Sequence, residues 1–351
     1  MMRFDIKKIK SWIKITVPSL LKKHSVPGAA VAVFIDGEVV FQYGCGVRCS
    51  GEDTPIGDRT VFDGASLAKP VFSYGVLRLA RDGNFDLDRP ISDYLEKPYI
   101  KGDERINKIT ARMVLSHTSG LPNWRPDFWT YSDSGIEISK SPGSLKIQYE
   151  PGSRFKYSAE GFNYLQAAVE QVTNDRIDHF IKNCVLDPLG MSRSSFVWME
   201  DFESSSALPH NDKGLMVSEW QWRPQEPLTV ASFFTTAVDY ARFFCATLVT
   251  EEEPHSDENR LPVRYLESVL QPQIKMQNIF AWSLIWGIEQ HEKETFFLQW
   301  GDNPGIKHFA VCSSTKRAGV VVLTNGQNGQ HVCRPVVEKI LGSKLDAFDN
   351  I

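Results

Sequence analysis

Apolar and basic residues alternate at helical spacing along the N-terminal part of the chain. Isoleucine or valine recurs every three or four positions at Ile6, Ile9, Ile13 and Val17, and lysines fill the positions between them. Such a stripe predicts an amphipathic helix whose apolar side packs on the rest of the fold. The lysines interrupt the apolar core that a secretory signal would need. The sequence as it stands is therefore expected to be cytoplasmic, and an export signal trimmed from it is left open.

Alternating apolar runs lie near both ends of the chain. Residues 28–47 hold two such runs on either side of Asp36-Gly37, a dipeptide typical of tight hairpin turns. Three further strands are predicted near the C-terminus, at 295–301, 306–314 and 318–326. An amphipathic helix follows at 330–345. Strands from both termini predict one antiparallel sheet with helices packed on it.

The middle of the chain is mainly helical in pattern. Helices are expected within 70–83, 109–120, 161–174, 176–190 and 235–248. The polar, proline-containing segment 199–229 is predicted to be a long loop, and whether it closes over a cleft is left open. We therefore predict an α/β (α+β) fold of two domains. Residues 1–65 and 291–351 would form the sheet domain, residues 66–290 the helical domain, and the active-site cleft would lie between them.

Composition and charge exclude several classes of function. The 351 residues carry a formal net charge of −4, which gives no basic surface for nucleic acid or anionic lipid. No apolar run is long enough to span a bilayer. The six cysteines contain no CxxC pair, which favours free thiols in a reducing compartment. The eight histidines show no HxH or HExxH spacing, so neither a metal nor a cofactor is predicted.

A serine and a lysine stand three residues apart at the start of a predicted apolar helix. Residues at i and i+3 share one helix face, so Ser66 and Lys69 can meet if the helix begins at or just before Ser66. The apolar residues that follow indicate burial, which favours the neutral lysine and lets it take the serine proton. Gly64 would give the turn freedom to expose the hydroxyl. The pattern predicts an activated nucleophile, with a chance Ser-x-x-Lys on a solvated helix as the alternative.

Further motifs occur in an order that resembles the serine β-lactamase-like family. They are "VPGAAVAVFIDGEVVFQYGCGVR", "FDGASLAKPVFSYGVLRLARDGNFDLDRPISDYL", "LSHTSGLP", "PGSRFKYSAEGFNYLQAAVE", "LDPLGM" and "TTAVDYARF", and the resemblance covers about residues 26–326. The family includes class C β-lactamases, D-alanyl-D-alanine carboxypeptidases, D-aminopeptidases and esterases. Several motifs in the family's order are more specific than Ser-x-x-Lys alone. The resemblance implies a β-lactamase/transpeptidase-like fold and a serine hydrolase that works through an acyl-enzyme.

The resemblance also implies a role for individual residues. Ser66 would be acylated, Lys69 would assist its deprotonation, and Tyr157 in "KYSA" would pass protons to the leaving group. That role would need a Tyr157 pKa well below the usual value of about 10, which a nearby lysine ammonium can supply. His117 in "LSHTSGLP" is expected to be structural, because the proposed mechanism already has a base.

The third family motif falls at "LQWGDNPG". Gln299, Trp300 and Gly301 align with its Lys/His-x-Gly, and the backbone N–H groups of Ser66 and Asp302 would form the oxyanion hole.

Two departures from the family pattern bear on the substrate. Ala159 replaces the Asn of Tyr-x-Asn, and Gln299 replaces the cation that would attract the carboxylate of a β-lactam or a peptide C-terminus. Lys307 or Arg223 could supply a cation instead, and the sequence does not place them. The departures favour a neutral ester, lactone or amide. Six aromatic residues are candidate pocket linings, namely Trp124, Trp129, Trp220, Trp222, Phe233 and Trp300.

These residues predict an esterase-like serine hydrolase of small molecules. A β-lactamase or D-amino-acid peptidase or carboxypeptidase is the alternative within the family. A catalytically inactive binding protein of the same fold is the alternative from another class, and the intact Ser66, Lys69 and Tyr157 argue against it. An acyltransferase would use the same three residues, so the sequence leaves it open together with the oligomeric state.

Overall fold

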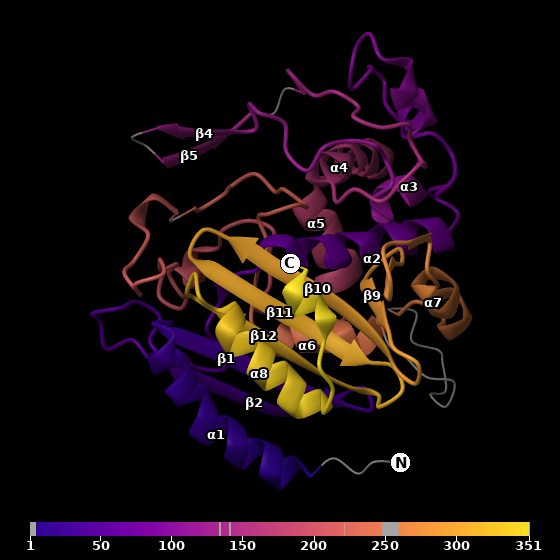
Figure 1. Ribbon diagram of the computed structural model, residues 1–351. Coiled ribbons are helices and arrows are strands. Elements are labelled where there is room, and N and C mark those ends of the chain that lie inside the picture. Colours follow the sequence, from indigo (N-terminus) through magenta and orange to yellow (C-terminus); the bar gives the residue numbers. More distant parts are fainter. Residues whose placement is uncertain (1–4, 133–134, 140–141, 221, 248–259, 351) are drawn as a thin grey trace.

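An antiparallel sheet of eight strands dominates the fold. The computed structural model describes residues 5–132, 135–139, 142–220, 222–247 and 260–350. The strand order in the sheet is β2-β1-β12-β11-β10-β9-β8-β7 (Figure 1). The strands are β1 (Gly28–Ile35), β2 (Glu38–Gly46), β7 (Ile274–Lys275), β8 (Phe280–Trp282), β9 (Gly287–Gln290), β10 (Thr295–Asn303), β11 (Ile306–Ser313) and β12 (Ala318–Thr324). The structure therefore confirms a sheet built from both ends of the chain.

Helices cover both faces of this sheet. They are α1 (Ile6–Lys23) and α8 (Gln330–Leu341) on one face and α6 (Ala237–Thr247) on the other (Figure 1). Because successive strand residues point to opposite faces, the side chains of β1 are shared between two apolar layers. Val31 and Val33 pack in the layer of α1 and α8, whereas Ala32 and Phe34 pack in the layer of α6. The central strands are consequently buried on both sides.

The predicted features of the N-terminal part are present. The buried side of α1 consists of Ile9, Ile13, Val17 and Leu21. The hairpin between β1 and β2 turns at Asp36 and Gly37, whose φ angles of +51° and +83° suit this dipeptide. Within the described ranges, no helix is both long and apolar enough to cross a membrane.

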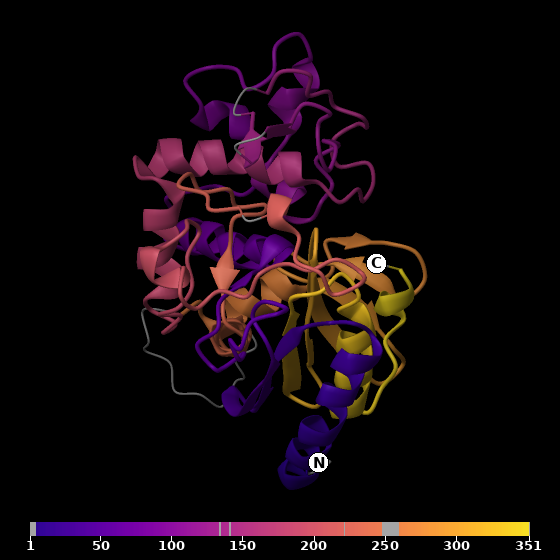
Figure 2. The same cartoon turned by 90° about the vertical axis from the view of Figure 1, so that its left-hand side faces the viewer.

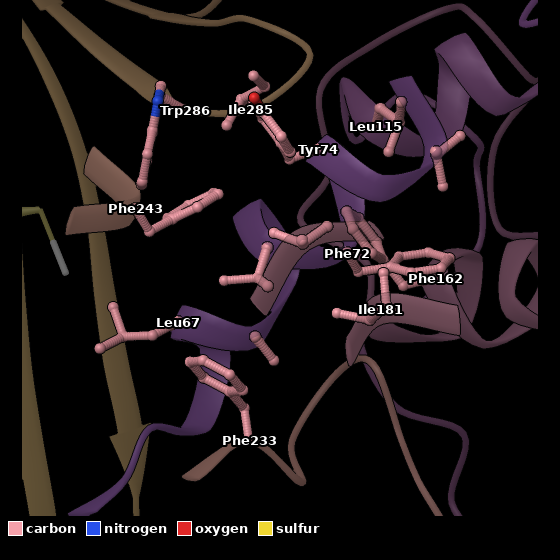
Figure 3. Close-up of a cluster of buried hydrophobic side chains, with 14 of the residues drawn as sticks. Leu67, Phe72, Tyr74, Leu115, Phe162, Ile181, Phe233, Phe243, Ile285 and Trp286 are labelled. Atoms are coloured by element: carbon pink, nitrogen blue, oxygen red, sulfur yellow. The ribbon is translucent and has the colours of Figure 1, made fainter. Parts of the chain in front are cut away.

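A mainly helical region adjoins the sheet (Figure 2). Its helices are α2 (Ala68–Arg81), α3 (Ala111–Leu115), α4 (Ala159–Thr173), α5 (Ile177–Ile181) and α7 (Val263–Leu270), and a π-helical turn (Lys182–Leu186) follows α5. Two small sheets pair β3 (Phe62–Asp63) with β6 (Phe234–Thr235) and β4 (Trp129–Ser132) with β5 (Gly135–Ile138). Every residue of α2 from Ala68 to Leu77 is buried, and Phe72 packs against Phe162 of α4 and near Ile181 of α5 (Figure 3). This packing fixes the start of α2 in space.

The sheet extends further than the sequence pattern indicates. The strands β7, β8 and β9 lie within 274–290, a range that the sequence analysis assigned to the helical domain. Their lengths of two to four residues are too short for a period-two pattern, and they are strands because they add to the edge of β10. The division of the chain into two domains stays a prediction. Residues 199–220 and 222–229 are mostly irregular, with short 3-10 turns at Glu200–Phe202 and Ser218–Trp220.

Candidate active site

Ser66 lies in a tight turn between β3 and α2. The turn is held by the residue before β6, since Gly64 N donates to Phe233 O at 2.5 Å. Ala65 has φ +48°, a strained angle for a residue with a Cβ, and its N–H donates to the Asp63 carboxylate at 2.9 Å. Gly64 has φ −77°, so the expectation that its conformational freedom shapes the turn is wrong. Its small size matters instead, because a Cβ there would lie 3.0 Å from the Phe233 ring.

Ser66 and Lys69 meet as the spacing predicts. Lys69 Nζ lies 3.0 Å from Ser66 Oγ and 3.0 Å from Val230 O. The lysine is only 2% exposed, and burial lowers the pKa of Lys69 to about 7. A neutral amine that donates one N–H to Val230 O can direct its lone pair at the serine hydroxyl. The pair can therefore transfer a proton near neutral pH.

Tyr157 reaches the same point from the segment before α4. Its Oη hydrogen-bonds Ser66 and accepts a hydrogen bond from Gln299 Nε2 at 3.2 Å. Burial raises the pKa of Tyr157 to about 12, and its hydrogen bonds to Ser66 and Gln299 offset this only in part. The expectation of a pKa well below 10 is wrong, because burial of the phenol outweighs every contribution that would favour the phenolate. Tyr157 is thus a neutral phenol at pH 7.

Aromatic rings surround Tyr157. His117 stacks on it with ring centroids 4.2 Å apart, Trp300 stacks at 5.9 Å, and Trp282 meets its edge at 5.8 Å. His117 is 1% exposed, and its Nδ1 accepts a hydrogen bond from Ser158 N at 3.1 Å. Burial holds the pKa of His117 well below its usual range, so the ring is neutral. These contacts support the structural role expected for His117.

Strand β10 passes directly along the turn of Ser66. Gln299 is fully buried, and its Nε2 donates to Ser66 O at 3.0 Å as well as to Tyr157 Oη. At Gly301 a Cβ would lie 2.6 Å from Gly64 O, so glycine is required for this close approach. Gln299 therefore joins the strand, the nucleophile turn and the tyrosine.

Ala159 lies where the family has an asparagine. It is fully buried at the start of α4 and offers no polar side chain to the site. Its N–H donates to Asn123 O at 3.2 Å. The second partner of Lys69 is the carbonyl oxygen of Val230, which comes from the end of the long loop region.

The cations considered in place of Gln299 already have acidic partners. Lys307 pairs with Asp302, its neighbour across the β10–β11 ladder, and Arg223 pairs with Glu203. The Asp302 side chain is exposed, and the use of its N–H in an oxyanion hole stays a prediction.

Asp63 is a site residue that the sequence analysis missed. Its carboxylate accepts hydrogen bonds from Asn303 Nδ2 at 3.0 Å and from Trp220 Nε1 at 3.4 Å, besides that from Ala65 N. Burial raises the pKa of Asp63 to about 6. The only signal was an acidic residue in "FDGAS", three positions before Ser66. Asp63 joins the nucleophile turn to the end of β10 and to the long loop.

Four of the six aromatic residues predicted as pocket linings form one cluster with Phe128. They are Trp124, Trp129, Trp220 and Trp222, with ring centroids 4.7 to 6.4 Å apart. Trp222 and Phe128 also line a cavity of about 410 Å³ beside α4. Phe233 instead packs in the core against Phe196, and Trp300 packs on Tyr157. The cluster therefore places an apolar surface next to the hydrogen bond from Trp220 Nε1 to the Asp63 carboxylate.

The described part of the chain does not bring together residues that could bind a metal ion. No group of three or more His, Cys, Asp or Glu side chains there could hold a metal ion. The six cysteines are free thiols.

Comparison with known proteins identifies relatives of several activities. The chain is 24% identical over 341 residues to "Penicillin-binding protein 4" of Amycolatopsis lactamdurans, covering 92% of this chain and 87% of that protein. It is 29% identical over 209 residues to "Esterase EstB" of Burkholderia gladioli, covering 55% and 52%. It is 23% identical over 197 residues to "Protein flp" of Staphylococcus aureus (strain N315), covering 55% of this chain and only 40% of that protein.

The fold and the family agree with these relatives. A solved structure described as "A class C beta-lactamase" superposes with a TM-score of 0.81 at 19% identity and covers 98% of both chains. At this identity the likeness establishes the β-lactamase/transpeptidase-like fold. The family model described as Beta-lactamase matches residues 14–335, which is most of the sequence. The chain therefore belongs to the beta-lactamase family.

Proposed function

We propose that this chain is a serine hydrolase that acts through an acyl-enzyme on Ser66, with neutral esters or amides as substrates. The observation that carries the proposal is the 3.0 Å contact between Ser66 Oγ and a buried Lys69 whose pKa is lowered to about 7. An amine that is partly neutral at physiological pH can take the hydroxyl proton as the oxygen attacks.

The proposed acylation moves one proton and exchanges one bond. Ser66 Oγ bonds to the substrate carbonyl carbon while its proton passes to Lys69. The bond to the leaving oxygen or nitrogen then breaks, and the leaving group receives that proton from the Lys69 and Tyr157 pair. Gln299 donates to Tyr157 Oη, which leaves the phenolic proton free to point at Ser66. Water then attacks the acyl carbon and passes a proton to the Lys69 and Tyr157 pair. The bond to Ser66 Oγ breaks, Ser66 takes that proton, and the acid leaves.

The charge of the site supports a neutral substrate. Gln299 is uncharged, and the nearby cations Lys307 and Arg223 each have an acidic partner. A substrate carboxylate would therefore have to displace an ion pair or bind without one, and both options weaken binding. The similarity to Esterase EstB is in line with this substrate class.

A β-lactamase or D-amino-acid peptidase is the second candidate. The observation that favours it is the match to Penicillin-binding protein 4, which spans 92% of the chain. The same three residues would serve that reaction. An acyltransferase reaction would use the same three residues as well. It differs from hydrolysis only in that an alcohol, and not water, accepts the acyl group from Ser66.

Intact-protein mass spectrometry after exposure to three reagents tests the proposal. The reagents are a fluorophosphonate, a short p-nitrophenyl ester and a penicillin, and Ser66→Ala is the matched control. We expect a fluorophosphonate adduct that the control lacks, ester turnover, and little penicillin adduct. A stable penicillin adduct would favour the second candidate. If none of the three reagents modifies the wild-type protein and no ester is turned over, the chain is an inactive binding protein and the proposal is wrong.

A further inference from the structure

A second cavity lies beyond the aromatic residues that pack on Tyr157. Its volume of about 540 Å³ is in the range of pockets that bury small organic ligands. Its walls come from β7, β8, β9 and β10, from the segment 153–155 and from residues 347 and 350 near the C-terminus. Ser66 and Lys69 do not line it, so the cavity is separate from the point of acylation.

The cavity combines apolar walls with two positive charges. Phe280, Trp282 and Trp300 provide aromatic surface, and Met276 at the rim is 37% exposed. Some buried side-chain nitrogen and oxygen atoms in the described ranges have no hydrogen-bond partner. None of these atoms belongs to a residue that lines the cavity. An alkyl chain could therefore lie against the aromatic wall, while Ser153, Gln277 and Asn350, which are exposed, can keep their contact with water.

The positive charges are Arg154 and Lys275, and none of the described lining residues is acidic. Arg154 and Lys275 are both exposed. The Arg154 guanidinium lies 4.4 Å from the centre of the Tyr149 ring. Among the described residues, neither cation forms an ion pair with a carboxylate. An anion at the rim would thus gain charge-assisted hydrogen bonds without displacing an acidic group.

We propose that this cavity is a binding site for a medium-chain fatty-acid anion. The carboxylate would pair with Arg154 and Lys275, and the alkyl chain would lie against Phe280 and Trp282. The burial of successive methylene groups supplies affinity, and the two cations select the charged head group. The inference does not depend on the proposed hydrolase activity, because no residue of the acylation chemistry contributes to the cavity.

The test is a titration of the full chain with laurate, kept below the concentration at which laurate forms micelles. Trp282 and Trp300 line the cavity, so intrinsic tryptophan fluorescence reports occupancy, and calorimetry gives the stoichiometry. We expect one site with a Kd on the order of 0.1 mM. Dodecanol and dodecylammonium, which match the chain length without the negative charge, should each bind at least about tenfold more weakly.

Variants separate this site from the acylation site. Lys275→Glu and Arg154→Ala should each weaken laurate binding by about tenfold, whereas Lys101→Glu, at an exposed lysine outside the cavity, should not. Ser66→Ala should bind laurate like the wild type. If laurate does not bind, or binds all variants equally, the proposal is overturned. It is also overturned if Ser66→Ala loses binding and laurate competes with the ester. Laurate binding in a protein that none of the three reagents modifies and that turns over no ester would refute the hydrolase proposal and leave this site intact.

Discussion

The most demanding prediction concerns the protonation of Lys69. If a neutral Lys69 takes the serine proton, kcat/KM for ester hydrolysis follows the neutral fraction of the lysine. With a pKa of about 7, that fraction rises from about 9% at pH 6 to about 91% at pH 8. We therefore expect kcat/KM to increase about tenfold over this interval.

The lowered pKa of Lys69 also makes the free energy of unfolding depend on pH, because the folded and unfolded chains bind different numbers of protons. The usual lysine value is 10.5, so between pH 7 and pH 10.5 the unfolded chain holds a proton that the folded chain lacks. The free energy of unfolding then rises with pH by about 1.4 kcal/mol per unit. Between pH 7 and pH 9 the wild type should gain about 2 kcal/mol relative to Lys69→Met, which cannot bind this proton, because the folded lysine is still half protonated at pH 7.

Two assays check these values. Initial rates with a p-nitrophenyl ester between pH 5 and pH 9, corrected for spontaneous hydrolysis, give the kinetic pKa. Urea denaturation of the wild type and of Lys69→Met at several pH values gives the difference in stability. The Lys101→Met variant removes an exposed lysine and should follow the wild type in the rate assay. A rate that is flat between pH 6 and pH 8, together with equal pH dependence of unfolding in wild type and Lys69→Met, would refute the reasoning.

Further predictions concern the residues around Ser66. Tyr157→Phe should lower kcat/KM by about 10²- to 10⁴-fold, measured with the same ester, since it removes the phenolic proton; wild-type turnover would exclude a role in proton transfer. Gln299→His should raise the affinity for carboxylate-bearing β-lactams, and unchanged binding by calorimetry would contradict our account of the third motif. Gly301→Ala should destabilise the fold by about 1–3 kcal/mol in urea denaturation, because its Cβ would meet Gly64 O at 2.6 Å. Gly57→Ala, where nothing lies within 4 Å, is the control and should be close to neutral.

Local patterns in the sequence were sufficient for much of the fold. The stripe of Ile9, Ile13 and Val17 predicts α1, and Asp36-Gly37 predicts the hairpin, because each depends on neighbouring residues alone. The motif order identified the family, and the spacing of Ser66 and Lys69 predicted their contact. The short strands β7 to β9 were not predictable, since they exist only by pairing with β10.

The tertiary structure decided the chemistry of the site. Whether Lys69 or Tyr157 is the group with the lowered pKa depends on burial from distant segments, and the structure reverses the expectation for the tyrosine. Asp63 gains its role from Trp220 and Asn303, which lie more than 150 residues away in the chain. A sequence states which groups are available and how neighbours are spaced. Desolvation and contacts between remote segments set the protonation states, and these arise only when the chain is folded.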